Sequence, residues 1–184
     1  MRPAHFVTCL LMVILAACRH ASEPAPDGMA AYERLAQDHT ALFPLPLTGP
    51  TKITSDFGRR RGVRGAAGSV HNGIDLAAPR GTSIHAPAGG RVRDVGHDRR
   101  GYGTYVSVAH PDGYVTLYAH LKAASVAAGD VVQRGEVIGQ VGMSGNATGP
   151  HLHLEVRQHG MLLDPKTTFD LKGLEHQPVF AALF

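Results

Sequence analysis

The residues best suited to chemistry are histidines and acids that recur at short, regular spacings. His151, His153 and Glu155 alternate with apolar residues. In a β-strand, alternate side chains point to the same face, so these three would share one face of a strand whose reverse is apolar. Upstream, His71 and Asp75 are four residues apart, with a glycine between them. We expect a sharp turn, rather than a helix, to bring these two side chains together.

Two imidazoles and one carboxylate can form a catalytic zinc site, which leaves a fourth position open for water. Two further histidines would then be free to act as an acid, a base or an oxyanion partner. His120 is one candidate, because it ends an expected strand at the rim of the fold. Non-haem iron also binds two histidines and a carboxylate. The export signal described below favours a zinc site over the iron site of an oxygenase. A histidine-rich β surface that binds nothing is the third interpretation, and the residues alone leave all three open.

The other eight histidines have no such spacing. We expect those within the domain, His85, His97, His110 and His159, to be ordinary solvated residues of strands and turns.

The segment that must position the candidates has the pattern of antiparallel β structure. Short runs rich in β-branched residues alternate with Gly, Pro, Asn and Asp from Lys52 to about Asp164. The runs are residues 82–84, 90–95, 104–108, 114–118, 131–132, 137–141 and 151–156. Pro111-Asp112-Gly113 is a turn signal between two of them. We therefore predict an all-β domain, preceded by one short helix at about residues 29–43.

The N-terminus has the features of a bacterial export signal. A positive Arg2 precedes twelve mostly apolar residues, a length typical of a signal peptide and too short to span a bilayer. The run ends at Leu15-Ala16-Ala17-Cys18, which resembles the lipobox at which a lipoprotein is cleaved and lipidated on cysteine. This resemblance implies an exported protein anchored to a membrane through Cys18, and Arg19 favours the outer membrane over an inner-membrane destination.

Composition and charge are those of an ordinary globular protein. The 184 residues are 43% apolar and 18% charged, with a net charge of +3 that comes from scattered side chains. We therefore expect no nucleic-acid partner, and we expect a monomer. Only Cys18 would remain after cleavage, because Cys9 lies in the signal, so no internal disulfide can form. We expect four segments: a signal peptide (1–17), a tether (18–42), the domain (43–166) and a C-terminal tail (167–184).

Several motifs in a fixed order resemble the M23 peptidase family of the lysostaphin and LytM type. They are His71-x-x-x-Asp75, Tyr118-Ala119-His120-Leu121 and Gly149-Pro150-His151-Leu152-His153-Leu154-Glu155-Val156. The resemblance implies a compact antiparallel sheet with a narrow groove, and one zinc ion per chain. By position, His71, Asp75 and His153 would bind the zinc, and His120 and His151 would be the catalytic partners. Asn72 and the basic residues Arg59 and Arg60 would border the groove.

The resemblance and the export signal together predict a zinc metalloendopeptidase that hydrolyses peptide bonds in peptidoglycan. Arg59 and Arg60 belong to a basic run that could meet stem-peptide carboxylates, although such runs are as often solvated loops. A non-catalytic regulator that activates a peptidoglycan amidase is the main alternative. A peptidase acting on exported proteins is the other.

Overall fold

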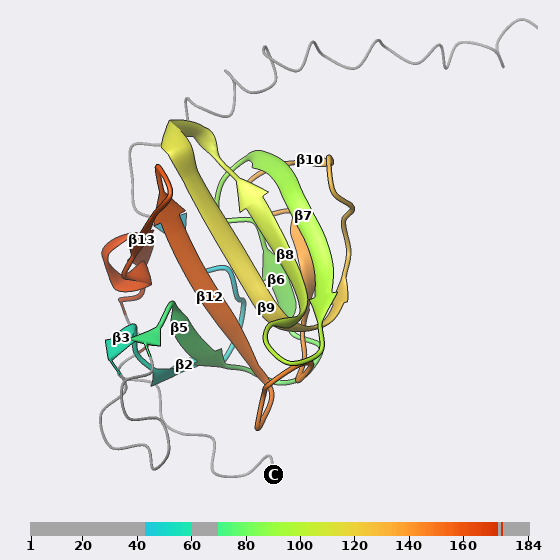
Figure 1. Cartoon of the computed structure of the whole chain (residues 1–184), viewed down its shortest axis with the longest axis vertical. Helices are drawn as coiled ribbons and strands as arrows, with labels where there is room; N and C mark the ends of the chain where they lie inside the picture. Colours follow the sequence, from blue (N-terminus) through green and yellow to red (C-terminus); the bar gives the residue numbers. More distant parts are fainter. Residues whose placement is uncertain (1–42, 60–69, 173, 175–184) are drawn as a thin grey trace, which may run out of the picture.

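A computed structural model describes residues 43–59, 70–172 and 174 of the chain (Figure 1). The expected signal peptide, the tether, the lipidation site at Cys18, the short helix before Phe43 and the groove residue Arg60 lie outside these residues. Within the described residues, no helix is long and apolar enough to cross a membrane.

The regular secondary structure of the described chain is almost entirely β-strand, which confirms the all-β prediction. The strands are β1 (Phe43–Pro44), β2 (Lys52–Ser55), β3 (Gly58–Arg59), β4 (Val70–His71), β5 (Ile74–Ala77), β6 (Ser83–His85), β7 (Gly90–Asp98), β8 (Gly103–Ala109), β9 (Tyr114–Ala124), β10 (Val131–Val132), β11 (Val137–Val141), β12 (His151–Gln158), β13 (Met161–Leu163) and β14 (Phe169–Asp170). Two short 3-10 turns, η1 (Pro111–Gly113) and η2 (Pro165–Thr167), interrupt them.

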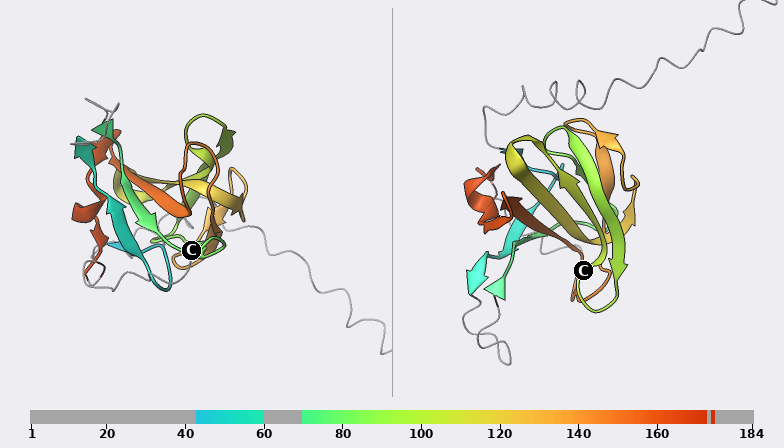
Figure 2. Two further views of the ribbon diagram at one scale, coloured as in Figure 1. Left: turned by 90° about the horizontal axis from the view of Figure 1, so that it is seen from below. Right: turned by 45° about the horizontal axis from the view of Figure 1, so that its top comes forward.

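One large antiparallel sheet dominates the fold. Its main strands follow the order β10-β7-β8-β9-β12-β5-β2, while β11 joins β6 to β9 and β13 pairs with β12. The sheet twists strongly from one edge to the other (Figure 2), as sheets of L-residues do. The expected runs at 90–95, 104–108 and 114–118 became the longer strands β7, β8 and β9, because each finds a hydrogen-bonded neighbour beyond the run itself.

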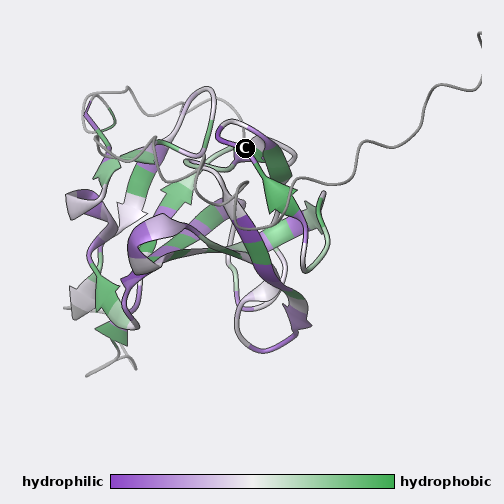
Figure 3. Cartoon of the chain, turned by 90° about the horizontal axis from the view of Figure 1, so that it is seen from above, coloured by the Kyte–Doolittle hydropathy of each residue, from purple (hydrophilic) through white to green (hydrophobic). Residues whose placement is uncertain are grey.

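The core lies against one face of this sheet. Its largest fully buried side chains include Tyr118, Phe169, Ile74, Leu76, Ile84, Leu121, Ile138, Leu152 and Leu154. Most of the strands carry both hydrophobic and hydrophilic residues (Figure 3), because one face packs inward and the other bears polar side chains. Burial of this apolar surface is the main driving force for folding, because the described residues include no cysteine that could form a disulfide.

The first and last described strands lie side by side. β1 pairs in parallel with β14, so Phe43 is opposite Phe169. The ring of Phe43 also contacts that of Tyr114, at the start of β9. Phe169 and Leu174, which fall in the segment expected to be a tail, are both buried in the core. The packed domain therefore includes residues beyond 166.

The prediction that His110 is a solvated residue is wrong. Its side chain is 1% exposed. Its Nδ1 hydrogen-bonds the carbonyl oxygen of Gly89, and its Nε2 hydrogen-bonds Thr116 Oγ1. Both polar atoms have a partner, which removes most of the cost of burying them.

Candidate metal centre

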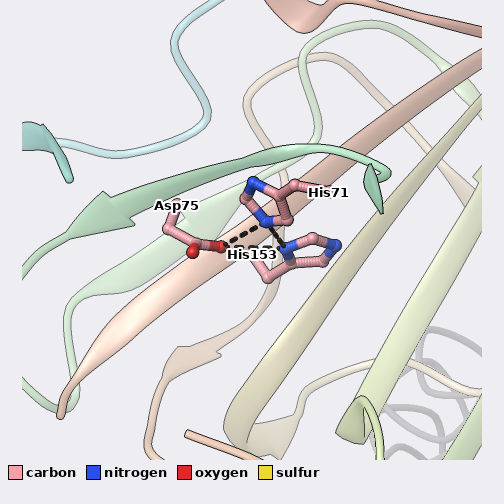
Figure 4. A group of neighbouring side chains, drawn as sticks. All are labelled: His71, Asp75 and His153. Carbon is pink, nitrogen blue, oxygen red and sulfur yellow. Dashed lines mark hydrogen bonds and ion pairs between the residues drawn. The ribbon is translucent and has the colours of Figure 1, made fainter. Parts of the chain in front are cut away.

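Three of the predicted site residues converge on one point. His71 Nε2 lies 3.1 Å from Asp75 Oδ1, and His153 Nδ1 lies 2.9 Å from the same oxygen. The two imidazole nitrogens are 3.1 Å apart. Figure 4 shows the three side chains pointing toward one another, two from the β4–β5 segment and one from β12. The described residues therefore include one His-Asp-His group that could hold a metal ion.

The register of the sheet creates this meeting point. β12 pairs with β5 so that His153 stands directly opposite Asp75. The chain bends at the turn Asn72-Gly73, between β4 and β5, so that His71 at the end of β4 faces the same spot. A Cβ atom on Gly73 would come within 2.1 Å of the backbone oxygen of Leu154. The turn can approach β12 this closely only because residue 73 is a glycine.

Hydrogen bonds fix which ring nitrogen of each ligand faces the centre. His71 Nδ1 is 2.8 Å from the carbonyl oxygen of Asp56, which can only accept, so Nδ1 carries the proton and Nε2 presents its lone pair. His153 is turned the other way: Nε2 is 3.2 Å from the Glu155 carboxylate, so Nδ1 faces the centre. Two imidazole lone pairs and a carboxylate oxygen thus point at one position.

Such an arrangement fits a cation. Three lone pairs that converge repel one another unless a positive charge lies among them. Ligand atoms at zinc distances in a tetrahedral shell are about 3.3 Å apart, close to the separations seen here. Two imidazoles and a carboxylate are also ligands that zinc prefers.

The charges of the centre agree with this reading. Burial alone would raise the pKa of Asp75, but hydrogen bonds and charge from His153 and His71 hold it well below its ordinary value, so Asp75 is anionic. Burial alone would lower the pKa of His153, yet contacts with Asp75 and Glu155 raise it. The surroundings therefore favour positive charge at this point.

The two predicted catalytic histidines flank the centre. The rings of His120 and His151 are 4.7 Å apart, and His151 Nε2 lies 3.8 Å from Asp75 Oδ1. Each Nδ1 donates to a backbone carbonyl, that of Ser144 for His120 and that of Gly149 for His151. In the neutral state both rings therefore carry a bare Nε2 that can accept a proton. Burial first, and neighbouring imidazoles in addition, lower the pKa of His120, so this ring stays neutral to a lower pH.

The expectation that His120 ends its strand is wrong. β9 continues for four more residues, to Ala124, and His120 sits inside it with φ of 61°. Between the β8–β9 pairs Thr104–Leu121 and Val106–Tyr118, β9 contains one extra residue. This is a β-bulge, which redirects a side chain without ending the strand, and bulges are frequent beside active sites.

The sequence did not indicate two residues that support the centre. Tyr102 donates its hydroxyl to Glu155 Oε1 at 2.6 Å, and the same oxygen accepts from His153. Strand alternation predicts that Glu155 shares a face with His153, but it indicates no role for this carboxylate. Tyr102 lies in the turn before β8, and no spacing in the sequence connects it to β12. Burial and then the hydrogen bond to Glu155 raise the pKa of Tyr102 to about 12, so its hydroxyl remains a donor.

A groove of about 470 Å³ has Glu155 and Tyr102 in its lining, but none of the three ligand residues, neither catalytic histidine, and neither Asn72 nor Arg59. It is lined by residues of β7, β8, β9 and β12 together with Tyr102, among them Arg93, Asp94, Tyr105, Leu117, Glu155 and Arg157. Of the residues expected to border a groove, Asn72 is half-buried and hydrogen-bonds the side chain of Tyr102. Arg59 lies in β3, and Arg60 is not described.

The chain is similar to known peptidases. The model of peptidase family M23 matches residues 69–165. The DD-carboxypeptidase/endopeptidase Mpg of Neisseria meningitidis is 47% identical over 115 residues, which cover 62% of this chain and 26% of that protein. The peptidoglycan DD-endopeptidase ShyC of Vibrio cholerae is 36% identical over 118 residues, covering 63% of this chain and 27% of that protein.

The fold has relatives among solved structures. A zinc-containing peptidase from Vibrio cholerae superimposes with a TM-score of 0.63 at 33% identity, over 68% of this chain and 39% of that one. The match spans about a quarter of the length of the two curated relatives, so the similarity concerns only part of each. The family match covers more than half of the chain and includes all five residues of the centre. The chain belongs to peptidase family M23.

Proposed function

We propose that this protein is a zinc metalloendopeptidase that hydrolyses peptide bonds in peptidoglycan. One observation carries the proposal. Three ligand atoms converge on a position that a cation could occupy, and two further imidazoles present a bare Nε2 beside it. The name of the relative ShyC supports peptidoglycan as the substrate class. One zinc ion per chain would be held by His71, Asp75 and His153.

The residues of the centre have separate roles in this proposal. Bound zinc would supply a Lewis acid that polarises the scissile carbonyl and lowers the pKa of water from 15.7 towards about 7. His120 and His151 would hold the attacking water, accept its proton at Nε2 and return a proton to the leaving amine. When either imidazole is protonated, its Nε2–H can also donate to the developing oxyanion.

The cell-envelope location is part of the proposal and rests on the N-terminal sequence. Residues 1–17 would be removed, and Cys18 would be lipidated and anchor the protein to a membrane, most naturally the outer membrane facing the periplasm. Two or more acyl chains suffice for stable anchoring. Mass spectrometry of the protein isolated from bacterial membranes would test this: a chain that begins at an acylated Cys18 is expected, and an unmodified Cys18 would refute it.

Digestion of purified sacculi tests the activity. The chain from residue 19 onward would be incubated with sacculi, and the released muropeptides would be identified by mass. We expect cross-linked muropeptides to shrink to smaller products, and this release to stop with a chelator or in His153→Ala. His97→Ala is the matched control, because His97 is an exposed histidine of β7 whose Nδ1 lies 3.0 Å from Thr104 Oγ1, outside the metal centre.

The same experiment separates the alternatives. If the folded, zinc-loaded protein releases nothing, the non-catalytic regulator becomes the better hypothesis, and addition of a peptidoglycan amidase would show whether the amidase is activated. Activity that is restored by iron but not by zinc after chelation would identify the metal as iron.

A further inference from the structure

Glu155 lies where the metal centre meets the groove. It follows His153 by two residues on the same face of β12, and its side chain is 1% exposed. It also lies beneath the turn that carries the other two ligands, because a Cβ atom on Gly73 would be 3.2 Å from Glu155 Cγ. This buried carboxylate is therefore close to both segments of the chain that supply the ligands.

The hydrogen bonds of Glu155 are concentrated on the atom that faces His153. Oε1 accepts from His153 Nε2 at 3.2 Å and from the Tyr102 hydroxyl at 2.6 Å. Oε2 receives only a long contact of 3.4 Å from Arg157, whose side chain is 42% exposed. A long ion pair with an exposed partner contributes little. The bond from Tyr102 is short, so Tyr102 is the group that holds Oε1 in place.

His153 depends on this carboxylate more than the other histidines depend on their partners. His71, His120 and His151 each donate a ring N–H to a backbone carbonyl, which the fold itself holds in position. His153 donates to a side chain instead. If that side chain moves, the proton can sit on Nδ1, and the ring then offers no lone pair to the centre.

We propose that Glu155 is a positioning residue for the metal ligand His153, and that Tyr102 holds Glu155 in that role. The inference rests on the proposed zinc site, since it concerns a ligand of that site. Glu155 keeps the proton of His153 on Nε2 and leaves Nδ1 free to bind. Carboxylates that accept a hydrogen bond from a metal-binding histidine typically change metal affinity by about 10- to 100-fold.

Zinc affinity, measured by competition with a chromophoric chelator, tests the proposal. We expect Glu155→Gln to weaken zinc binding by about 10-fold or more, and Tyr102→Phe to weaken it by about fivefold. Tyr105→Phe is the matched control. Tyr105 lines the same groove and lies against the ring of Tyr102, but its hydroxyl donates to Asp94. We expect its zinc affinity to equal that of the unmodified protein.

A second measurement reports the position of the proton directly. Nitrogen NMR of the metal-free protein, at a pH where the imidazoles are neutral, distinguishes Nδ1–H from Nε2–H. Without metal, Asp75 attracts a proton to Nδ1 of His153 and Glu155 attracts one to Nε2. We expect the Nε2–H fraction to fall in Glu155→Gln and to be unchanged in Tyr105→Phe. A purely structural role for Glu155 would not change this signal.

The outcomes separate this inference from the proposed function. If the unmodified protein binds no zinc, the proposed function fails. If it binds zinc and both Glu155→Gln and Tyr102→Phe bind equally well with an unchanged His153 signal, only the inference about Glu155 fails. If Glu155→Gln does not fold, Tyr102→Phe decides the question: an unchanged affinity overturns the proposal and a weakened one supports it.

Discussion

Each histidine of the centre has one nitrogen committed to a fixed acceptor and one directed inward. Three of the acceptors are backbone carbonyls, and the fourth is the carboxylate of Glu155. The inward nitrogens therefore need no rearrangement before they bind a cation or accept a proton. Preorganisation of this kind lowers the cost of binding and of reaction, because the groups are already oriented.

The different roles of these histidines lead to a prediction at the residue scale. His120→Ala and His151→Ala should each lower the hydrolysis rate by about 10²- to 10⁴-fold, because a positioned acid or base is lost. Each variant should still bind about one zinc, because neither residue is in the three-ligand group. His71→Ala should lose both zinc and activity. Elemental analysis of the dialysed proteins, paired with rate measurements, checks this.

A loss of zinc from His120→Ala and His151→Ala, equal to that from His71→Ala, would contradict the separation of ligands from catalytic partners. His97→Ala controls for the general effect of removing an imidazole from the sheet.

Local geometry predicts part of this group: strand alternation places His151 and His153 on one face, and the glycine between His71 and Asp75 indicates a turn. The structure contradicts the strand end that suggested His120, so its inclusion rests on the resemblance to the M23 family. Only that resemblance implied the division of the five residues into ligands and catalytic partners. Tyr102 and the buried His110 were not predictable in this way. Their partners, Glu155 and Gly89, lie 53 and 21 residues away, and only the packing of strands brings them together.

At the scale of elements, the pairing of β12 with β5 determines whether a centre exists. A shift of one residue would turn His153 to the opposite face, because side chains alternate along a strand. The turn at Gly73 fits against β12 without room for a side chain. The pairing and the tight turn together hold ligands from both segments at one place.

Gly73→Ala should therefore damage both stability and metal binding. The added methyl group would meet the Leu154 carbonyl and must push the turn away from β12. We expect a cost of about 1–3 kcal/mol, as for overpacking elsewhere, and a weaker affinity for zinc. Thermal unfolding with and without zinc measures both effects.

Gly149→Ala is the matched control for this change. No atom lies within 4 Å of a Cβ atom built there, and its φ is not in the left-handed region. If Gly73→Ala unfolds at the same temperature as Gly149→Ala, the close approach at the turn is not important for stability.

The strands themselves were predictable, but their ends and irregularities were not. Short β-branched runs between glycines predicted most of the long strands. The bulge at His120 has no counterpart in the sequence of β9, because a bulge is a mismatch between two paired strands and depends on both. The extension of β9 to Ala124 likewise depends on its pairing with β11.

For the whole molecule, the metal centre is a cross-link between distant parts of the chain. His71 and His153 are 82 residues apart, and no internal disulfide can stabilise the domain. A ligand that binds only the folded state adds stability of RT ln(1 + [L]/Kd), or about 2.7 kcal/mol at a concentration 100 times Kd. A bound ion should thus contribute a substantial part of the stability of this domain.

Removal of zinc by a chelator should accordingly lower the Tm by several degrees, and a return of zinc should restore it. Differential scanning calorimetry of the same sample before and after chelation measures the shift. His153→Ala should show no shift in either direction. An equal response of His153→Ala would mean that zinc stabilises the protein from another site.

The pairing of β1 with β14 has a consequence for attachment of the protein to a solid support. Phe43 and Phe169 are neighbours, and Phe43 also touches Tyr114 at the start of β9. His120 follows Tyr114 by six residues, which is about 20 Å along a strand. The first and last described strands, β1 and β14, therefore lie near the start of β9, away from His120. A protein held to a bead through its N-terminus should therefore cleave a soluble cross-linked muropeptide as fast as the free protein, because the attachment reaches the fold far from His120.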